Sequence, residues 1–176
     1  FCLENPPDIA YTHNWIGQPV TVTDAAGTRT FAYNAEFNLI SETINGIYNK
    51  TLIRSYTDSG YKGRIAGMQI GDVNNYAYSY DSYGRLNQIT TPAGNFTYTR
   101  LADSELIENL TRPNGVNTAW SYEPRRDLVT EVANGSVSSY GYTNDALGRR
   151  TSMSRSGSAF AVPDILTYGY NAFHTD

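Results

Sequence analysis

The chain has 176 residues, a formal net charge of −4 and a pI of about 5.1, which argues against a nucleic-acid-binding protein because such proteins carry a basic stripe. Leu, Ile, Val and Phe account for only 35 of the 176 residues, but 15 tyrosines and 2 tryptophans supply aromatic packing that disordered chains lack. The composition therefore indicates a folded protein in which tyrosine replaces part of the usual aliphatic packing.

A unit of about twenty residues recurs along the chain, and its clearest copies are Tyr80–Leu86 and Asn144–Arg150. Each copy begins with an anchor residue, usually aromatic, that precedes a turn. Successive anchors lie 18 to 26 residues apart. Because one repeat cannot bury its own apolar face, this pattern predicts stacked neighbours and lowers the expectation of an enzyme. In chain order the anchors are His13, Tyr33, Tyr56, Tyr80, Tyr98, Tyr122, Asn144 and Tyr170.

The tetrad after the anchor predicts a type I turn, because Asn or Asp stands first and Gly stands fourth. Gly accepts the positive φ that closes a bulged hairpin. Asn14–Gly17, Asp81–Gly84 and Asp145–Gly148 follow the pattern. Phe37 takes the Gly position after Asn34, and Tyr56 and Tyr98 precede loops about two residues longer. Residues 122–126 lack both Asp and Gly, so either the turn or the strand pairing is expected to differ there.

A second turn lies midway through each unit, where Asn-Gly, Asp-x-x-Gly or Pro-x-Gly favours a hairpin connection. These turns are Asp24–Gly27, Asn45-Gly46, Gly71-Asp72, Pro92–Gly94, Pro113–Gly115, Asn134-Gly135 and Ser156-Gly157.

Between the turns, aromatic residues two positions apart predict strands with their rings on one face. Aliphatic residues mark the partner strands. Two strands of six to eight residues per unit give an all-β fold: an antiparallel meander of repeated β-hairpins, about fourteen strands in all, in a curved or spiralling sheet. Residues 103–110 also have a capping residue and helix-like spacing, so a helix is the rival there. The aromatic pairs include Tyr76-Tyr78-Tyr80, Phe96-Tyr98, Trp120-Tyr122, Tyr140-Tyr142 and Tyr168-Tyr170.

No linker-like stretch interrupts the repeats, so residues 1–176 are expected to form a single array of seven to eight units. Cys2 is the only cysteine, which excludes an internal disulfide or a thiolate metal cluster. No apolar run reaches the length of a membrane span, and residues 1–7 do not resemble a signal peptide. The chain starts without Met and stops inside a repeat, so we expect a piece of a longer protein.

The Tyr-Asp-x-x-Gly-Arg-Leu core at Tyr80–Leu86, with Pro92-x-Gly94 after it and Tyr-x-Tyr pairs before it, resembles the Rhs/YD-repeat family. The resemblance covers roughly residues 11–171. It implies hairpins that wind into a spiralling sheet closing a hollow shell. Such shells enclose a toxic C-terminal polypeptide in bacterial relatives, toxin-complex proteins among them, and belong to adhesion receptors in animal teneurins.

The resemblance also implies export or display at the cell surface, and carbohydrate binding has been associated with these repeats. The self-cleaving region of many bacterial shells, with its acidic catalytic residues, has no counterpart in this sequence, so no catalytic residue is carried over.

Histidines and acidic residues offer few candidates for chemistry. His13 and His174 stand at or near repeat positions otherwise filled by Tyr or a turn residue, which favours scaffold roles over metal binding or base catalysis. Asp81 and Asp145 recur at the first turn position, which favours backbone capping over a pair of catalytic acids. No metal or other cofactor is expected.

Aromatic strands carry the one competing functional interpretation. Tyr76, Tyr78, Tyr80, Trp120 and Tyr122 are candidate ligand-binding residues, since stacked rings present flat faces to sugars while Asn and Asp supply hydrogen bonds. Cross-strand aromatic packing, at about 0.2–1 kcal/mol per pair, is the simpler explanation. We favour packing.

The sequence thus predicts a non-catalytic segment of a shell wall that encloses a toxic or cargo polypeptide. Its expected partners are the rest of the parent shell, the cargo and other copies through exposed sheet edges. A carbohydrate- or protein-binding surface module is the alternative, and a glycosidase on an all-β scaffold is a third, less favoured hypothesis. We expect a secreted or cell-surface parent protein, with no nucleic-acid partner and no membrane insertion.

Overall fold

The computed structural model describes residues 9–47, 49–57, 60–72 and 74–171. These residues form fifteen β-strands and no helix, which confirms the all-β prediction with one strand more than expected. Residues 107–111 are a strand, so the helical alternative there is wrong. The strands are β1 (Ala10–His13), β2 (Pro19–Asp24), β3 (Gly27–Tyr33), β4 (Leu39–Gly46), β5 (Lys50–Tyr56), β6 (Ile65–Ile70), β7 (Asn74–Tyr80), β8 (Leu86–Thr91), β9 (Gly94–Arg100), β10 (Ile107–Thr111), β11 (Thr118–Tyr122), β12 (Val129–Asn134), β13 (Ser138–Asn144), β14 (Arg150–Ser156) and β15 (Asp164–Thr167).

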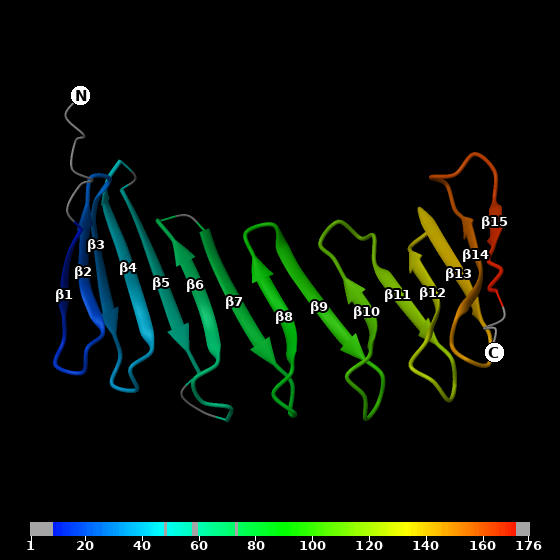
Figure 1. Ribbon diagram of the computed structural model, residues 1–176, viewed down its shortest axis with the longest axis horizontal. Helices are drawn as coiled ribbons and strands as arrows, with labels where there is room; N and C mark the ends of the chain where they lie inside the picture. Colours follow the sequence, from blue (N-terminus) through cyan, green and yellow to red (C-terminus); the bar gives the residue numbers. More distant parts are fainter. Residues whose placement is uncertain (1–8, 48, 58–59, 73, 172–176) are drawn as a thin grey trace. The chain divides into compact units, whose positions relative to one another are not determined.

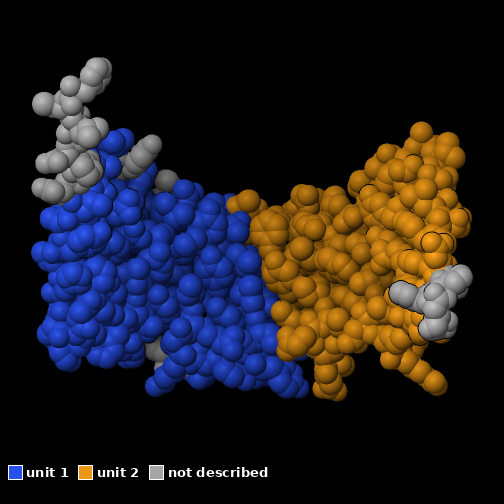
Figure 2. All heavy atoms as spheres, viewed as in Figure 1, with its two compact units in different colours: residues 1–92 blue, residues 93–176 orange. Residues whose placement is uncertain are grey.

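The chain divides into two compact units, Phe1–Pro92 and Ala93–Asp176, which Figure 2 shows in different colours. Unit 1 contains β1 to β8 and unit 2 contains β9 to β15. Within each unit, every strand pairs antiparallel with the strands that precede and follow it in sequence (Figure 1). Each unit is therefore a meander of hairpins, as the spacing of turn residues predicts.

The two faces of each sheet differ in chemistry because side chains alternate along a strand. In unit 1 one face carries a row of hydroxyls across β1 to β5, formed by Thr12, Thr21, Thr30, Thr43 and Thr51, which pair in succession. Their neighbours along the strands place larger, mainly apolar side chains on the opposite face, which we call the aromatic face. In unit 2 the aromatic face includes the row Trp120, Val132, Tyr140 and Arg155.

Each unit is a single layer, so its apolar side chains are covered only by their neighbours on the same face. No hydrophobic residue is buried in the described part of the chain, and Trp15 is 88 % exposed. The tyrosines of β7 and the aromatics of β11 are half-buried. Lateral packing between adjacent repeats therefore replaces the enclosed core of a layered domain.

Most anchors end an odd-numbered strand at a register shift, as in Tyr33, Tyr56, Tyr80 and Tyr122. The fifth anchor is an exception. The equivalent register shift in β9 involves Arg100, which pairs with Ile107, so the assignment of Tyr98 to this position is wrong by two residues. The aromatic spacing gives the wrong anchor here. Phe96 and Tyr98 lie on the aromatic face, but Tyr98 stands two residues before the register shift at Arg100.

The midway turns lie at the predicted glycines, with two exceptions. After Ser156-Gly157 the connection to β15 runs on to Asp164. At Asn45-Gly46, β4 continues to Gly46, which pairs with Gly27, and the connection to β5 comes later. Both glycines have positive φ, and a Cβ on Gly27 would lie 2.1 Å from the Asn45 carbonyl oxygen. The glycine therefore serves a close approach of two backbones rather than the turn itself.

Candidate functional site

Asp81 shows how the repeated turn is built. Its Oδ1 atom accepts hydrogen bonds from the backbone N–H groups of Tyr83 and Arg85, both at 2.9 Å. Its Oδ2 atom accepts one from the Arg85 Nε–H at 2.7 Å, which is also an ion pair. Gly84 closes the turn at φ 75°. The carboxylate thus caps the local backbone, as the recurrence of Asp at this position predicts.

Other repeats copy this arrangement with and without charge. Asp145 caps the N–H groups of Leu147 and Arg149 and pairs with the Arg149 side chain at 2.7 Å. Asn14 makes the same two backbone contacts through its amide oxygen, and its amide nitrogen donates to the Gln18 side chain at 2.9 Å. The Asp–Arg pair and the Asn–Gln pair are therefore charged and neutral versions of one turn.

The charged turns hold their carboxylates ionised. Burial alone would raise the pKa of Asp81, but hydrogen bonds from Arg85 and Tyr83 and the Arg85 charge together lower the pKa below its ordinary value. The pKa of Asp145 is lowered against burial in the same way by Arg149 and Leu147. Both carboxylates are therefore bound by donors of their own turn.

The anchor tyrosines link consecutive repeats through their hydroxyls. In unit 1 the hydroxyl of Tyr56 donates to the Leu39 carbonyl at 2.8 Å. Leu39 is the residue that pairs with the preceding anchor, Tyr33. The hydroxyl of Tyr80 reaches Ile65, the partner of Tyr56, at 2.7 Å. The same bond joins Tyr33 to Pro19, Tyr122 to Ile107 and Tyr170 to Arg150.

This set of hydroxyl bonds, which we call the tyrosine clamp, satisfies one carbonyl at each of five register shifts. Burial raises the pKa of Tyr122, which keeps its hydroxyl protonated and able to donate. The sequence predicts tyrosine packing but not this bond, because the acceptor lies 14 to 20 residues earlier in the chain.

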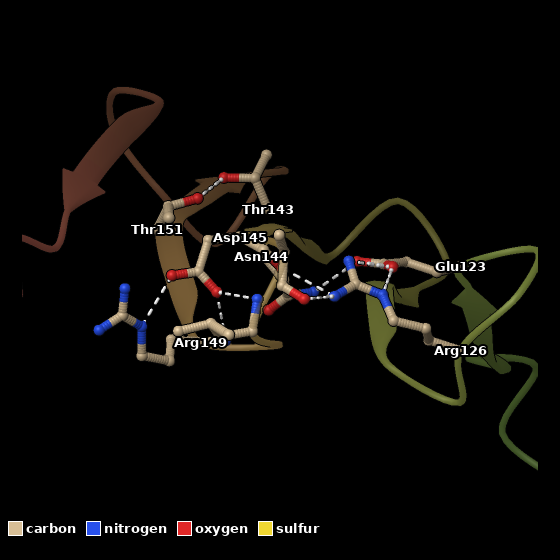
Figure 3. Close-up of polar contacts among 9 residues, drawn as sticks. Glu123, Arg126, Thr143, Asn144, Asp145, Arg149 and Thr151 are labelled. Atoms are coloured by element: carbon tan, nitrogen blue, oxygen red, sulfur yellow. Dashed lines mark hydrogen bonds and ion pairs between the residues drawn. The ribbon is translucent and has the colours of Figure 1, made fainter.

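Asn144 stands where the clamp would need a tyrosine, and a polar bridge replaces it (Figure 3). The Asn144 amide donates to Glu123 at 3.0 Å, and Glu123 forms an ion pair with Arg126. Arg126 in turn donates to the Asp145 carbonyl at 2.7 Å. The Asn144 hydrogen bond, ahead of the Arg126 contact, lowers the pKa of Glu123 despite burial. The turn that lacks Asp and Gly therefore joins its neighbour through side chains.

Successive anchor turns are linked in some places and separated in others. Gln18 donates to the Phe37 carbonyl at 3.1 Å, and Tyr61 donates to the Ser82 carbonyl at 2.8 Å.

In unit 2 a hollow of about 380 Å³ opens between the turns at 101–106 and 123–128, and we call it the notch. The residues that line it include Ser104, Glu108, Trp120, Tyr122, Glu123 and Asp127.

The five candidate ligand-binding residues fall into two groups. Tyr76, Tyr78 and Tyr80 lie together on β7 in unit 1, and Trp120 and Tyr122 lie on β11 in unit 2. Their partners across the strands are aliphatic or methionine side chains: Tyr76 pairs with Met68, Tyr78 with Ile89 and Trp120 with Val132. The rings are half-buried by these neighbours, and two of the hydroxyls are engaged in the clamp.

Of the remaining candidates, the structure describes only His13. The His13 ring stacks on Tyr11 with centroids 6.3 Å apart. His174 and Cys2 lie outside the described residues. Within the described ranges, no group of three or more His, Cys, Asp or Glu side chains is placed to hold a metal ion. No helix there is long and apolar enough to cross a membrane.

No family model matches the chain. Solved structures do match its fold. The crystal structure of TcdB2-TccC3-Cdc42 aligns over 92 % of this chain with a TM-score of 0.69 and 15 % identity. The structure of TcdB2-TccC3 without its hypervariable C-terminal region aligns over the same share, with a TM-score of 0.68 and 16 % identity. A further TcdB2-TccC3 structure gives a TM-score of 0.66.

The chain spans about a tenth of the length of each of these chains. At this level of identity the match concerns the fold. It confirms the expected resemblance to Rhs/YD-type shell proteins: the all-β array of hairpins is the fold found in toxin-complex chains.

Proposed function

We propose that this chain is a structural, non-catalytic segment of the wall of an Rhs/YD-type shell that encloses a toxic or cargo polypeptide. The observation that carries the proposal is the alignment of 92 % of the chain with about a tenth of a toxin-complex chain. A repeat array that matches a small part of a larger chain fits a segment of a wall better than a complete binding module.

Containment requires no reactive group, only a continuous barrier. Strands about 4.8 Å apart with paired backbones leave no opening for a polypeptide. The capped turns around Asp81 and Asp145 and the tyrosine clamp hold successive hairpins in register, which supports such a barrier. On this proposal the partners are the remaining shell and the enclosed polypeptide, and the parent protein is secreted or displayed by a bacterium.

Protease protection tests the proposal. The longest polypeptide that contains these residues is expressed whole and treated with a broad-specificity protease, before and after mild denaturation. We expect a segment of the folded protein to survive digestion until the sheet is opened. Immediate digestion of every segment outside the β-array, with the array itself intact, would exclude enclosure.

Recognition of a sugar or a partner protein by the aromatic face is the alternative, and the notch beside Trp120 and Tyr122 is the observation that favours it. Calorimetry against a panel of oligosaccharides distinguishes the two proposals. Saturable binding that is lost in Trp120→Ala and Tyr78→Ala, while the far-UV spectrum is unchanged, would support recognition. Trp15→Ala is the control because Trp15 is exposed on a turn in unit 1.

A further inference from the structure

Each anchor turn ends at a closing residue, whose carbonyl accepts a hydrogen bond from the N–H of the first turn residue. The Thr57 N–H donates to the Arg64 carbonyl at 2.8 Å, and the Leu101 N–H donates to the Leu106 carbonyl at 3.0 Å. Leu106 therefore holds the same position in its turn as Arg64. In chain order the closing residues are Gln18, Asn38, Arg64, Arg85, Leu106, Leu128 and Arg149.

An arginine at the closing position covers the ring of the next anchor when that anchor is a tyrosine. The Arg64 Cζ atom lies 5.3 Å from the centroid of the Tyr80 ring, and the Arg149 Cζ atom lies 4.6 Å from that of Tyr170. The tyrosine clamp brings the two groups together, because each of these hydroxyls reaches the carbonyl of the residue that follows the arginine. A guanidinium over an aromatic ring is a favourable cation–π contact.

A hollow opens where a shorter closing residue precedes a tyrosine anchor. In unit 1, Asn38 precedes Tyr56, and both line a hollow of about 380 Å³. In unit 2, Leu106 precedes Tyr122, and both line the notch. Among the described residues, no arginine lies over either ring. The notch therefore lies at the position that an arginine side chain occupies in the covered repeats.

The two hollows differ in charge. One lysine and one glutamate line the hollow in unit 1. Glu108, Glu123 and Asp127 line the notch, and Arg126 pairs only with Glu123. Within the part of the chain that the structure describes, Glu108 and Asp127 form no ion pair. The notch thus combines aromatic rings with two carboxylates that lack a cation.

We propose that the notch binds an arginine side chain of a partner polypeptide. The planar guanidinium would stack on Tyr122, as Arg64 stacks on Tyr80, and its N–H groups would donate to Glu108 and Asp127. A hollow of about 380 Å³ falls in the usual range for ligand pockets, about 300–1,000 Å³. Its lining residues all belong to unit 2, and binding there does not require an enclosed cargo.

Fluorescence of Trp120 tests the site in a Trp15→Phe background, where Trp120 is the only tryptophan. The folded protein is titrated with N-acetyl-arginine amide at constant ionic strength, and then with the citrulline and lysine derivatives. Citrulline has the shape of arginine without its charge, and lysine has the charge without the planar fork. We expect a saturable change in emission at millimolar arginine derivative, and binding at least about tenfold weaker for the other two.

Two variants test the role of the carboxylates. Glu108→Gln and Asp127→Asn should each raise the half-saturation concentration about three- to tenfold, because each removes a charged acceptor. Glu131→Gln is the matched control, since Glu131 is exposed on β12 and does not line the notch. Its half-saturation concentration should equal that of the Trp15→Phe parent.

Leu106→Arg supplies the arginine from within the chain. The new side chain should cover Tyr122 and fill the notch, so the variant should keep the circular dichroism spectrum and lose the response to the arginine derivative. The two carboxylate variants decide the question if Leu106→Arg does not fold. Equal binding of the arginine and citrulline derivatives, an unchanged response in both carboxylate variants, or a folded Leu106→Arg variant that still responds would overturn the proposal. Saturation by an oligosaccharide without a response to arginine would also overturn it and assign the notch to sugars.

Discussion

At the scale of single residues, the hydroxyl of Tyr80 is the group whose removal isolates the tyrosine clamp. Tyr80→Phe keeps the ring and leaves the Ile65 carbonyl without its 2.7 Å donor. We expect the free energy of unfolding to fall by about 0.5–1 kcal/mol, because the variant loses the net contribution of one exposed hydrogen bond. Urea titration followed by circular dichroism measures the change.

Tyr83→Phe is the matched control in the same unit. Tyr83 is 65 % exposed, and its ring lies beside the Arg85 guanidinium at 4.9 Å, a contact that phenylalanine preserves. Its stability should match that of the parent chain. Equal losses in the two variants would show that the hydroxyl bond to Ile65 has no special role.

The charged turns predict a loss of stability in acid. Folding lowers the pKa of Asp81 and of Asp145 below their ordinary value of 3.8. A carboxyl whose pKa is lower in the folded state stabilises the protein above the unfolded pKa, and this contribution disappears as the pH falls through the folded pKa. The urea midpoint should therefore be level near neutral pH and decline from about pH 5 downwards.

The chain supplies its own neutral control for this effect. Asp81→Asn/Arg85→Gln reproduces the side chains of the Asn14–Gln18 turn, which makes the same backbone contacts without charge. The double variant should show a shallower decline in urea midpoint between pH 5 and pH 3 than the parent, measured by the same titration. An identical decline would assign the acid sensitivity to other carboxyls.

Residue types predict much of this chemistry, but the partners of the residues are harder to predict. Asp at the first turn position implies a backbone cap, because the acceptors and donors lie within four residues. The acceptor of the Tyr80 hydroxyl lies 15 residues away on another strand and depends on the register shift at Tyr56. The bridge at Asn144 is hidden for the same reason: its partner Glu123 lies 21 residues earlier.

At the scale of the hairpin, two glycines in equivalent turns distinguish backbone strain from crowding. Gly17 and Gly84 have φ values of 86° and 75°, so alanine is strained at both positions. A Cβ at Gly84 would lie 2.9 Å from atoms of the Tyr61 ring, whereas a Cβ at Gly17 would meet nothing within 4 Å. We expect Gly17→Ala to cost about 1 kcal/mol and Gly84→Ala about 1–3 kcal/mol more.

Thermal or urea unfolding of the two variants provides the measurement, and Tyr61→Ala supplies the background that removes the obstructing ring. In that background the two alanine substitutions should cost about the same. If Gly84→Ala still lowers stability more than Gly17→Ala in the Tyr61→Ala background, backbone strain and not the Tyr61 ring is the cause.

The bridge in unit 2 predicts that two adjacent arginines differ in importance. Arg126 pairs with Glu123 and donates to the Asp145 carbonyl of the next turn, whereas Arg125 is exposed. Arg126→Ala should lower the free energy of unfolding by about 1–2 kcal/mol, because it removes two charge-assisted contacts and leaves Glu123 half-buried. Arg125→Ala should change it by less than about 0.5 kcal/mol. Equal changes in the free energy of unfolding of the two variants, measured by urea titration, would show that the bridge does not stabilise unit 2.

Element boundaries could be predicted wherever turn chemistry and strand period agree. They agree around Tyr80, where the Asp81–Gly84 turn follows directly. They disagree at Tyr98, where an aromatic pair ends two residues before the register shift at Arg100. Asn45-Gly46 misleads in another way, because the same dipeptide that favours a tight turn also permits the close crossing of Gly46 with Gly27.

At the scale of the whole molecule, repetition makes the fold predictable and the function difficult to predict. The recurring turns at Asp81 and Asp145 specify hairpins one after another, and the comparison with toxin-complex chains confirms the result. The notch has no such signature. It lies between the turns at 101–106 and 123–128, and both of these turns lack the glycine that marks most other anchor turns.

A single-layer array should also unfold with an unusually low dependence on denaturant. The chain exposes 12465 Å². A compact protein of 19.5 kDa exposes about 8500 Å², and its extended chain about 28000 Å². Unfolding therefore exposes about four-fifths of the area expected for a compact protein, and the m-value in urea should be lower in the same proportion.

Because separate unfolding of the two units would also broaden the transition, the titration is followed by two probes. Trp15→Phe leaves the half-buried Trp120 to report on unit 2 by fluorescence, and circular dichroism reports on both units together. A low m-value at both probes is the expected signature of sheets with two solvated faces. An m-value typical of a compact protein of this size would mean that the aromatic faces are covered in solution.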